Sequence, residues 1–238
     1  MGRSPSPTDR RQQELVAAVR VIHAEVRASY GSPRMAAELN ARGYAGSENT
    51  AADLMRAYSI RGKAPRRFVR TTDSRHGLPV AADVLDRDFD PTGPNALWSA
   101  DITYIPTADG WLYLAVVEDL FSRMIVGWAM AAAMTSRFAV DALEMAIRRR
   151  LPGEGLIAHS DRGSQYANQH HRGVLARHGI TGSMSRGTQC WENAPVESFF
   201  AGLKRELVHA ETYTTHEPAK ASIFEYLEAF YNRIRRHS

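Results

Sequence analysis

The sequence predicts a small all-α helix-turn-helix domain followed by a larger α/β domain, whose mixed five-stranded sheet is flanked by helices. Two patterns predict this class. Before residue 60, apolar residues recur at the three-and-four spacing of amphipathic helices, in segments that glycines separate. After Pro94, runs typical of strands come first and helical spacing returns later. We therefore expect a disordered tail over 1–13, the helix-turn-helix domain over 14–62, a basic, proline-containing linker over 63–94 and the α/β domain over 95–238.

Composition excludes several classes of protein. With 238 residues, 44% hydrophobic and 24% charged, the chain has the length and composition of a globular protein. Its most apolar stretches, 111–117 and 125–134, are shorter than the roughly 18 residues of a membrane span, and the N-terminus lacks a secretory signal. The single cysteine, Cys190, excludes an internal disulfide and a multi-cysteine zinc module. We expect a cytoplasmic protein with no membrane partner.

Positive charge is concentrated at the front of the chain. Residues 1–75 contain 14 Lys and Arg against 7 Asp and Glu, whereas the remaining residues contain 16 against 19. A basic section ahead of a mildly acidic body favours contact with a polyanion such as nucleic acid. Charge alone leaves a solvated basic face open as the alternative.

Three helices are expected in this basic section. The first covers 14–30, and Gly31 ends it. The second is capped by Ser32, has Pro33 in its first turn and stops at Gly43. The third runs from Ser47 to about Tyr58, the place of the helix that enters the DNA major groove. Any small helical bundle would show this spacing, but basic residues that can lie along phosphates follow directly. We expect DNA contacts from Arg56, Arg61, Lys63, Arg66 and Arg67.

The α/β domain is expected to begin with three antiparallel strands joined by short turns. The first alternates between apolar and polar residues, the second is nearly continuously apolar, and the third follows a short "FSR" connection. These strands cover 97–106, 111–120 and 124–130. Asp119 and Arg123 are expected to fix the turn between the second strand and the third.

Helices and two further strands complete the expected sheet. A helix covers 136–150, and a short fourth strand ends at Asp161. A helical segment then leads to a fifth strand, "ITGSMS" at 180–185, and two helices close the chain. Because the later strands enter through helices, we expect a mixed sheet with helices on its faces.

Three carboxylates stand out by position. Asp101 is a charge inside an otherwise buried strand, and Asp161 lies where a strand ends beside a glycine-containing loop. Read singly, each is explained equally well as a turn or cap residue. Glu197 lies in the first turn of a helix over 194–208, where the helix dipole keeps it ionised, and Lys204 lies on the same flank.

Together, these carboxylates form a hard, all-oxygen donor set that suits Mg²⁺ or Mn²⁺. Two such ions about 4 Å apart can activate an attacking oxygen and stabilise a leaving one at a phosphate. The sequence therefore favours a site at Asp101, Asp161 and Glu197 that cuts and joins phosphodiesters.

The motifs resemble those of one family. The runs "WSADITYIPTADGWLYLAVVEDLFSRMIVGWAM", "HSDRGSQY", "SMSRGTQCWENAPVESFFAGLKREL" and "FEYLEAFYNRIRRHS" are similar to the second-reading-frame catalytic subunit of bacterial insertion-sequence transposases of the IS-three type. That family belongs with retroviral integrases in the RNase H-like superfamily. "IHAEVRASYGSPRMAAELNARG" with "LMRAYSIRG" resembles its helix-turn-helix.

The resemblance implies residue roles. The family's acidic triad falls on Asp101, Asp161 and Glu197. The last two are separated by 35 residues, the spacing that is characteristic of this branch of the superfamily. Lys204 matches a basic residue that contacts DNA near the scissile phosphate. Arg162 and Gln165, after Asp161, are further expected DNA contacts, and a solvated loop is the alternative for them.

The resemblance also implies partners and a reaction. We expect two Mg²⁺ or Mn²⁺ ions, double-stranded DNA as terminal inverted repeats and as target, the upstream-frame transposase subunit, a homo-oligomer on DNA, and a place at the bacterial nucleoid. The expected reaction is metal-dependent cleavage at the element's ends followed by 3′-hydroxyl strand transfer. A nuclease on the same fold that hydrolyses without joining, and a DNA-binding remnant that does not cut, are the alternatives.

Overall fold

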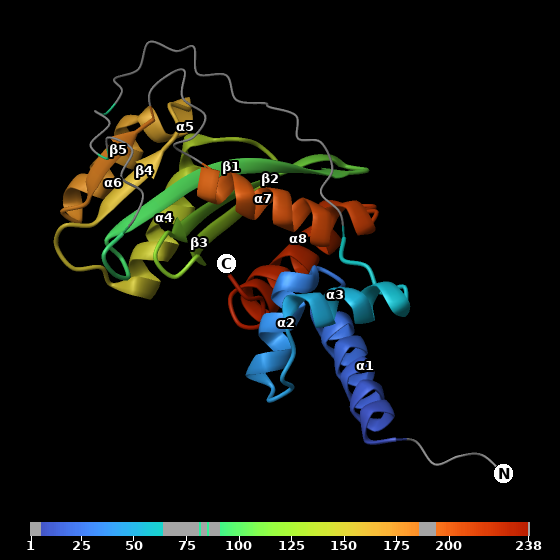
Figure 1. Ribbon diagram of the computed structural model, residues 1–238. Helices are drawn as coiled ribbons and strands as arrows, with labels where there is room; N and C mark the ends of the chain where they lie inside the picture. Colours follow the sequence, from blue (N-terminus) through green and yellow to red (C-terminus); the bar gives the residue numbers. More distant parts are fainter. Residues whose placement is uncertain (1–5, 64–80, 82–84, 86–90, 186–193, 238) are drawn as a thin grey trace. The chain divides into compact units, whose positions relative to one another are not determined.

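The computed structural model describes residues 6–63, 81, 85, 91–185 and 194–237 (Figure 1). Contacts divide the chain into two units, which are described separately. One combines the residues up to Arg66 with Ile234–Ser238, and the other is Arg67–Arg233. None of the helices in the described part of the chain has the length and apolar character that crossing a bilayer requires.

Helix α1, Pro7–Glu25, opens the first unit and begins earlier than we expected. We predicted a disordered tail over 1–13, but a capping box starts the helix inside it. The Ser6 hydroxyl accepts a hydrogen bond from the Asp9 backbone N–H, and the Asp9 carboxylate accepts one from the Ser6 backbone. The fixed φ of Pro7 suits the first helical position, where no backbone N–H is needed. The prediction was wrong for residues 7–13 because they are polar, so no apolar periodicity marks the first turns, and residues 1–5 lie outside the described residues.

Helices α2, Ser32–Ala41, and α3, Glu48–Ala57, complete the helical unit. Their apolar stripes meet α1 in a core that includes the fully buried Val19, Ile22, Met35, Leu39 and Ala51. The Ser47 hydroxyl caps α3 by accepting a hydrogen bond from the Thr50 backbone N–H. The cap of α2 differs from the prediction, because Gly31 occupies it and Ser32 is already helical.

The C-terminal segment belongs to this helical unit, although we expected it in the α/β domain. The Arg236 backbone N–H donates to the Tyr30 hydroxyl at 2.7 Å, and the Arg236 guanidinium pairs with Glu38. Glu38 also pairs with Arg42, and these two cations hold the pKa of Glu38 below its usual value against the opposing effect of burial. Nothing in the local pattern of 234–238 indicates such a long-range contact.

The second unit is built on a five-stranded sheet in the order β3-β2-β1-β4-β5. Its first three strands form the expected meander, and the short strands β4 and β5 extend it in parallel beside β1. The strands are β1, Leu97–Thr107; β2, Gly110–Asp119; β3, Met124–Ala131; β4, Ile157–Ser160; and β5, Thr181–Met184. The predicted mixed sheet is confirmed.

Helices cover the sheet. Helix α4, Ser136–Arg150, packs on β3 and β2, and its apolar side shares a core with Trp98, Ala100 and Val117 of the sheet. In Figure 1, α7 runs on the other side of the sheet from α4. The remaining elements are α5, Ser164–Ala167; α6, Gln169–Arg177; α7, Ala194–Glu206; a 3₁₀ turn, Val208–Ala210; α8, His216–Glu225; and a π-helix, Tyr226–Tyr231.

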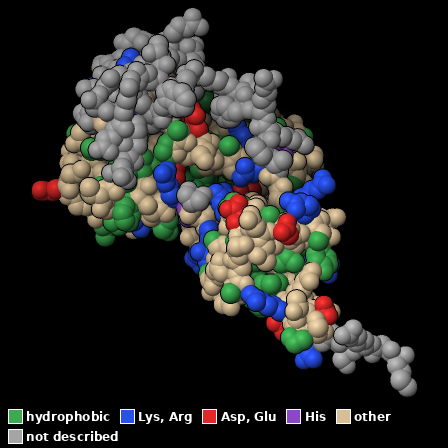
Figure 2. Space-filling view, viewed as in Figure 1, with side chains coloured by type: hydrophobic (Ala, Val, Ile, Leu, Met, Phe, Trp, Pro, Cys, Tyr) green, Lys and Arg blue, Asp and Glu red, His purple; other side chains and the backbone are tan. Residues whose placement is uncertain are grey.

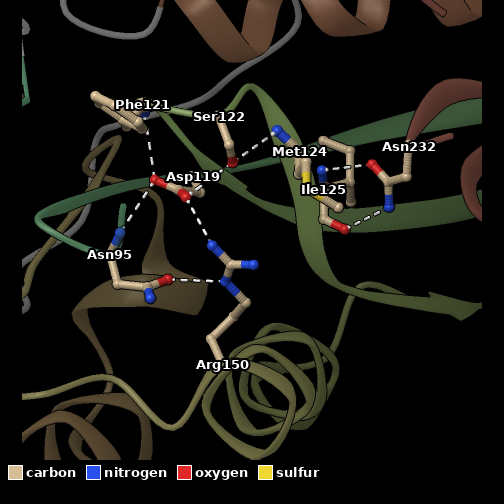
Figure 3. Close-up of polar contacts among 8 residues, drawn as sticks. All are labelled: Asn95, Asp119, Phe121, Ser122, Met124, Ile125, Arg150 and Asn232. Atoms are coloured by element: carbon tan, nitrogen blue, oxygen red, sulfur yellow. Dashed lines mark hydrogen bonds and ion pairs between the residues drawn. The ribbon is translucent and has the colours of Figure 1, made fainter. Parts of the chain in front are cut away.

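Asp119 fixes the turn between β2 and β3, as predicted (Figure 3). Its fully buried carboxylate accepts hydrogen bonds from the Phe121 backbone N–H and the Ser122 hydroxyl, and it pairs with Arg150 of α4 at 3.2 Å. The Arg123 backbone N–H donates to the Asp119 carbonyl, and Arg123 adopts a left-handed conformation at φ 58°. A buried charge is thus satisfied by the turn and by a helix far away in sequence.

Candidate active site

The sheet's register brings Asp101 and Asp161 to neighbouring positions. Strand β4 pairs in parallel with only the first four residues of β1, and the last pair is Ala100 with Ser160. Asp101 is the next residue of β1, and Asp161 is the residue that follows the end of β4. Because parallel neighbours in register lie side by side, the end of β4 places the two carboxylates together.

The Asp101 carboxyl has a strongly perturbed pKa, which is raised from 3.8 to about 8. Burial is the largest cause, and repulsion from Asp161 and from Glu197 adds to it. A hydrogen bond from the Ile102 backbone N–H at 2.7 Å and the positive charge of Lys204 act in the opposite direction. The four predicted charged residues therefore interact in the folded chain, although they come from a strand, a strand end and a helix.

The loop after β4 holds Asp161 in place. The Gly163 backbone N–H donates to Asp161 Oδ1 at 2.8 Å. A Cβ atom at position 163 would lie 2.8 Å from the same oxygen, so a larger residue would displace the carboxylate. Arg162 Nε donates to the Ser185 carbonyl at 2.6 Å and ties this loop to the end of β5.

Helix α7 supplies Glu197 in its first turn and Lys204 near its end. Its buried stripe, which includes Val196, Phe199 and Leu203, anchors it, and it contacts β1. Burial lowers the pKa of Lys204, and attraction to Asp101 opposes this shift. Lys204 Nζ also lies 4.9 Å from the centre of the Tyr104 ring.

The carboxylates of the site are hard oxygen donors, but they do not form a closed ligand cluster. Within the described residues, no group of three or more His, Cys, Asp or Glu side chains is arranged as a metal site. The repulsion that raises the pKa of Asp101 nevertheless shows that negative charge is concentrated beyond what Lys204 offsets. A hard cation with oxygen ligands would relieve that repulsion.

Comparisons with known proteins agree with this arrangement. The "HTH-like domain" family model matches residues 10–68, and two models described as "Integrase core domain" match residues 91–190 and 197–238. The transposase InsF for insertion sequence IS3A of Escherichia coli (strain K12) is 47% identical over 209 residues, covering 88% of this chain and 73% of that protein. The chain belongs to the IS3 family of insertion-sequence transposases.

Other comparisons extend the similarity of this transposase. The insertion element IS600 31 kDa protein of Shigella sonnei is 42% identical over 234 residues, which are 98% of this chain and 86% of that protein. Among solved structures, a chain of the simian T-cell lymphotropic virus intasome in complex with PP2A regulatory subunit B56 gamma matches with a TM-score of 0.51 and 16% identity. The match covers 93% of this chain and 70% of that chain. The latter match supports the fold, and the expected role in DNA transposition is confirmed by the family.

The expected DNA contacts of the transposase belong to both units. Gln165 lies in the short helix α5, where we expected a loop, and Arg162 is held by Ser185 as described above. Arg56 is exposed on α3 and pairs with Asp53 at 2.7 Å. Figure 2 shows acidic side chains among the basic ones on the helical unit. Arg61 is exposed, Lys63 is half-buried, and Arg66 and Arg67 lie outside the described residues.

Sequence reasoning missed Tyr166, which is buried beside the carboxylates. Burial and the negative charges of Asp101 and Asp161 raise the pKa of its hydroxyl well above 10. The side chain packs edge-on against His171, with ring centres 5.4 Å apart. The signal was its place five residues after Asp161 in a short helix, but a tyrosine there is equally typical of core packing.

Proposed function

We propose that this transposase cleaves DNA at the ends of its insertion sequence and joins the freed 3′-hydroxyl to target DNA, using Asp101, Asp161 and Glu197 as a metal-binding catalytic triad. The observation that supports this most is the raised pKa of Asp101, to about 8, with Asp161 and Glu197 among its causes. Such concentrated negative charge is costly in the absence of a cation, and perturbed carboxyls of this kind cluster at functional sites.

The three carboxylates suit two Mg²⁺ or Mn²⁺ ions, because all their donors are hard oxygens. Bound there, the ions would lower the pKa of an attacking oxygen and stabilise the leaving oxygen of an in-line displacement. Glu197 lies in the first turn of α7, where the helix dipole is favourable to a negative charge. Gly163 fixes the Asp161 carboxylate through its backbone N–H, so Asp161 is pre-positioned before any ligand arrives.

Lys204 is proposed to hold DNA at this centre. Its ammonium is half-buried and near Asp101, so it can neutralise part of a phosphate's charge beside the carboxylates. Arg162 and Gln165 are proposed as contacts on the loop side of the site. In-line displacement at phosphorus depends on positioning and charge neutralisation. No protein nucleophile is required.

The helical unit is proposed to bind the terminal inverted repeats, with α3 in the major groove. Arg56, Arg61, Lys63, Arg66 and Arg67 would contact phosphates on that DNA. Two ends of one element must be held at once, so we propose a homo-oligomer on DNA. We also propose that the upstream-frame subunit takes part in assembling this complex.

The test is Mg²⁺-dependent nicking and strand transfer on a labelled oligonucleotide that contains the element's end. The wild-type chain is compared with Glu197→Gln, which replaces one carboxylate of the site by a neutral amide. Glu217→Gln is the matched control, because Glu217 also occupies the first turn of a helix but is exposed and pairs with Lys220. Each protein is assayed with and without the upstream-frame subunit.

Joined product that is lost in Glu197→Gln and retained in Glu217→Gln would support the proposal. Nicked DNA without joined product would indicate the hydrolytic alternative. Binding without any product, with or without the upstream subunit, would indicate a DNA-binding remnant. Cleavage that persists in Glu197→Gln would refute the assignment of the triad.

A further inference from the structure

Two aromatic side chains lie toward the turn of the β1–β2 hairpin. Tyr104 of β1 and Trp111 of β2 pack at 74° to each other, with ring centres 4.7 Å apart. Trp111 lies diagonally across the strand pair from Tyr104, because Pro106 is its direct partner. Trp111 is 52% exposed, whereas Tyr104 is half-buried. The pair therefore offers an aromatic surface to solvent that the core of the domain does not use.

Lys204 connects this pair to the carboxylates. Its Nζ lies over the Tyr104 ring at 4.9 Å from the ring centre, within the range of a cation–π contact. The same ammonium is attracted to Asp101. Helix α7 contacts β1, so one rigid element carries the lysine between the aromatic pair and the proposed catalytic centre. Lys204 thus contacts the aromatic pair and also interacts with the proposed catalytic centre.

The chemistry of these three residues selects a particular class of ligand. A cation beside exposed aromatic rings is the combination that binds unpaired nucleotides, since the bases stack on the rings while the cation attracts the phosphates. Bases inside a duplex cannot reach such rings, because their faces are covered by their neighbours in the stack. The terminal pair of a blunt duplex exposes only its outer face, whereas a base that has left the duplex can place either face on the rings and is free to move to them.

We propose that Tyr104, Trp111 and Lys204 form a binding site for an unpaired nucleobase of the DNA end next to the scissile bond. This proposal rests on the proposed function, because it takes the nearby carboxylates as the cleavage centre. Trp111 supplies the stacking face, Tyr104 orients the tryptophan through its edge-on contact, and Lys204 attracts the phosphate of the unpaired nucleotide. The site makes the enzyme prefer DNA ends whose terminal pairs are open.

The test measures binding of the full chain to two duplexes of the element's end. One is blunt, and the other ends in unpaired nucleotides, the first of which is 2-aminopurine. Ca²⁺ replaces Mg²⁺ so that binding is measured without cleavage. Stacking on an aromatic side chain quenches 2-aminopurine fluorescence, so the probe reports contact as well as affinity.

Trp111→Ala is compared with Phe121→Ala, since Phe121 is also 52% exposed but lies in the β2–β3 turn. Wild-type protein should bind the open end about tenfold more tightly than the blunt end and quench the probe, by the usual size of base–aromatic stacking. Trp111→Ala should lose both the preference and the quenching, whereas Phe121→Ala should keep both. Trp111→Phe, which retains an aromatic face, should keep most of the preference.

Several results would overturn the proposal. Wild-type protein that does not distinguish the two ends, or that binds neither, would refute it, as would equal loss of affinity for both ends in Trp111→Ala. A Trp111→Ala variant that changes the oligomeric state in sedimentation while the preference persists would assign the surface to protein contact instead. Preference and quenching that persist in a protein without cleavage activity would keep this site and refute the proposed function alone.

Discussion

Replacing Asp101 by Asn should make the stability of the metal-free protein less sensitive to pH. Asp101 has a pKa of about 8 in the folded chain, against 3.8 as its ordinary value. Between these two values the folded state keeps a proton that the unfolded state has lost. Stability falls with rising pH wherever the folded state binds more protons, so the wild-type protein loses stability from about pH 4 to pH 8. Asn cannot titrate, and the variant does not share this loss.

The size of the effect follows from linkage. One proton bound only in the folded state changes the free energy of unfolding by about 1.4 kcal/mol per pH unit. From pH 5 to pH 7, the wild-type protein should therefore lose about 2–3 kcal/mol relative to Asp101→Asn, after allowance for the partial exposure of the side chain. The variant should be the more stable protein at neutral pH, because the wild-type chain must take up a proton at Asp101 on folding and Asn needs none.

The assay is urea unfolding of both proteins in EDTA-containing buffers across this pH range. Asp109→Asn is the control, because Asp109 is exposed in the turn between β1 and β2. Added Mg²⁺ should stabilise the wild-type protein and not Asp101→Asn, and increasingly so toward pH 8, since binding must displace the proton. Parallel pH profiles for the wild-type protein and Asp101→Asn in EDTA would refute the reasoning, because Asp101 would then not keep a proton on folding.

Three further substitutions test the packing that supports the site, each by urea unfolding. Gly127→Ala should destabilise the domain by about 3 kcal/mol or more, because the new Cβ atom would lie 2.2 Å from a backbone carbonyl oxygen of α4. Gly153→Ala is the control and should leave stability nearly unchanged, because a Cβ atom there would have no neighbour within 4 Å. Asp119→Ala should cost about 2–4 kcal/mol, since it breaks a buried ion pair and the β2–β3 turn. Tyr226→Phe should cost about 1–3 kcal/mol by removing the 2.7 Å hydrogen bond to the buried Glu206 carboxylate.

Much of the sheet was predictable because its strands differ in local pattern. The alternation around Asp101 and the continuous apolar run of β2 are visible in the sequence, and the structure places both strands within a residue or so of the prediction. The start of α1 was not predictable from periodicity, because its first turns are exposed and polar. There the capping box of Ser6 and Asp9 defines the helix, and such local hydrogen bonding has no hydrophobic signal.

The candidate site was predictable in its members but not in its surroundings. Asp101, Asp161 and Glu197 could be selected by chemistry and spacing, and the register of β1 with β4 explains why two of them meet. Tyr166 and Tyr104 were missed, because their positions relative to the carboxylates and Lys204 depend on how α5 and α7 pack. Side-chain contacts between elements far apart in sequence have no counterpart in a single sequence's periodicity. For the same reason, the contact of Arg236 with Glu38 was not foreseen.

The charges of the site lead to one more consequence for the proposed reaction. Without metal ions Asp101 keeps its proton at neutral pH, but Asp161 and Glu197 still repel a DNA phosphate, and Lys204 supplies one cation whose pKa burial already lowers. Without metal ions, a phosphate should therefore not settle among the carboxylates. DNA contacts with the helical unit and with the proposed base-binding site involve basic and aromatic side chains, so they bring no negative charges together. These contacts should therefore persist without metal. On this proposal, DNA ends dock first at basic and aromatic surfaces, and the metal ions then allow the scissile phosphate to enter. Affinity for DNA and affinity for Mg²⁺ should each increase the other, because the coupling of two ligands is reciprocal.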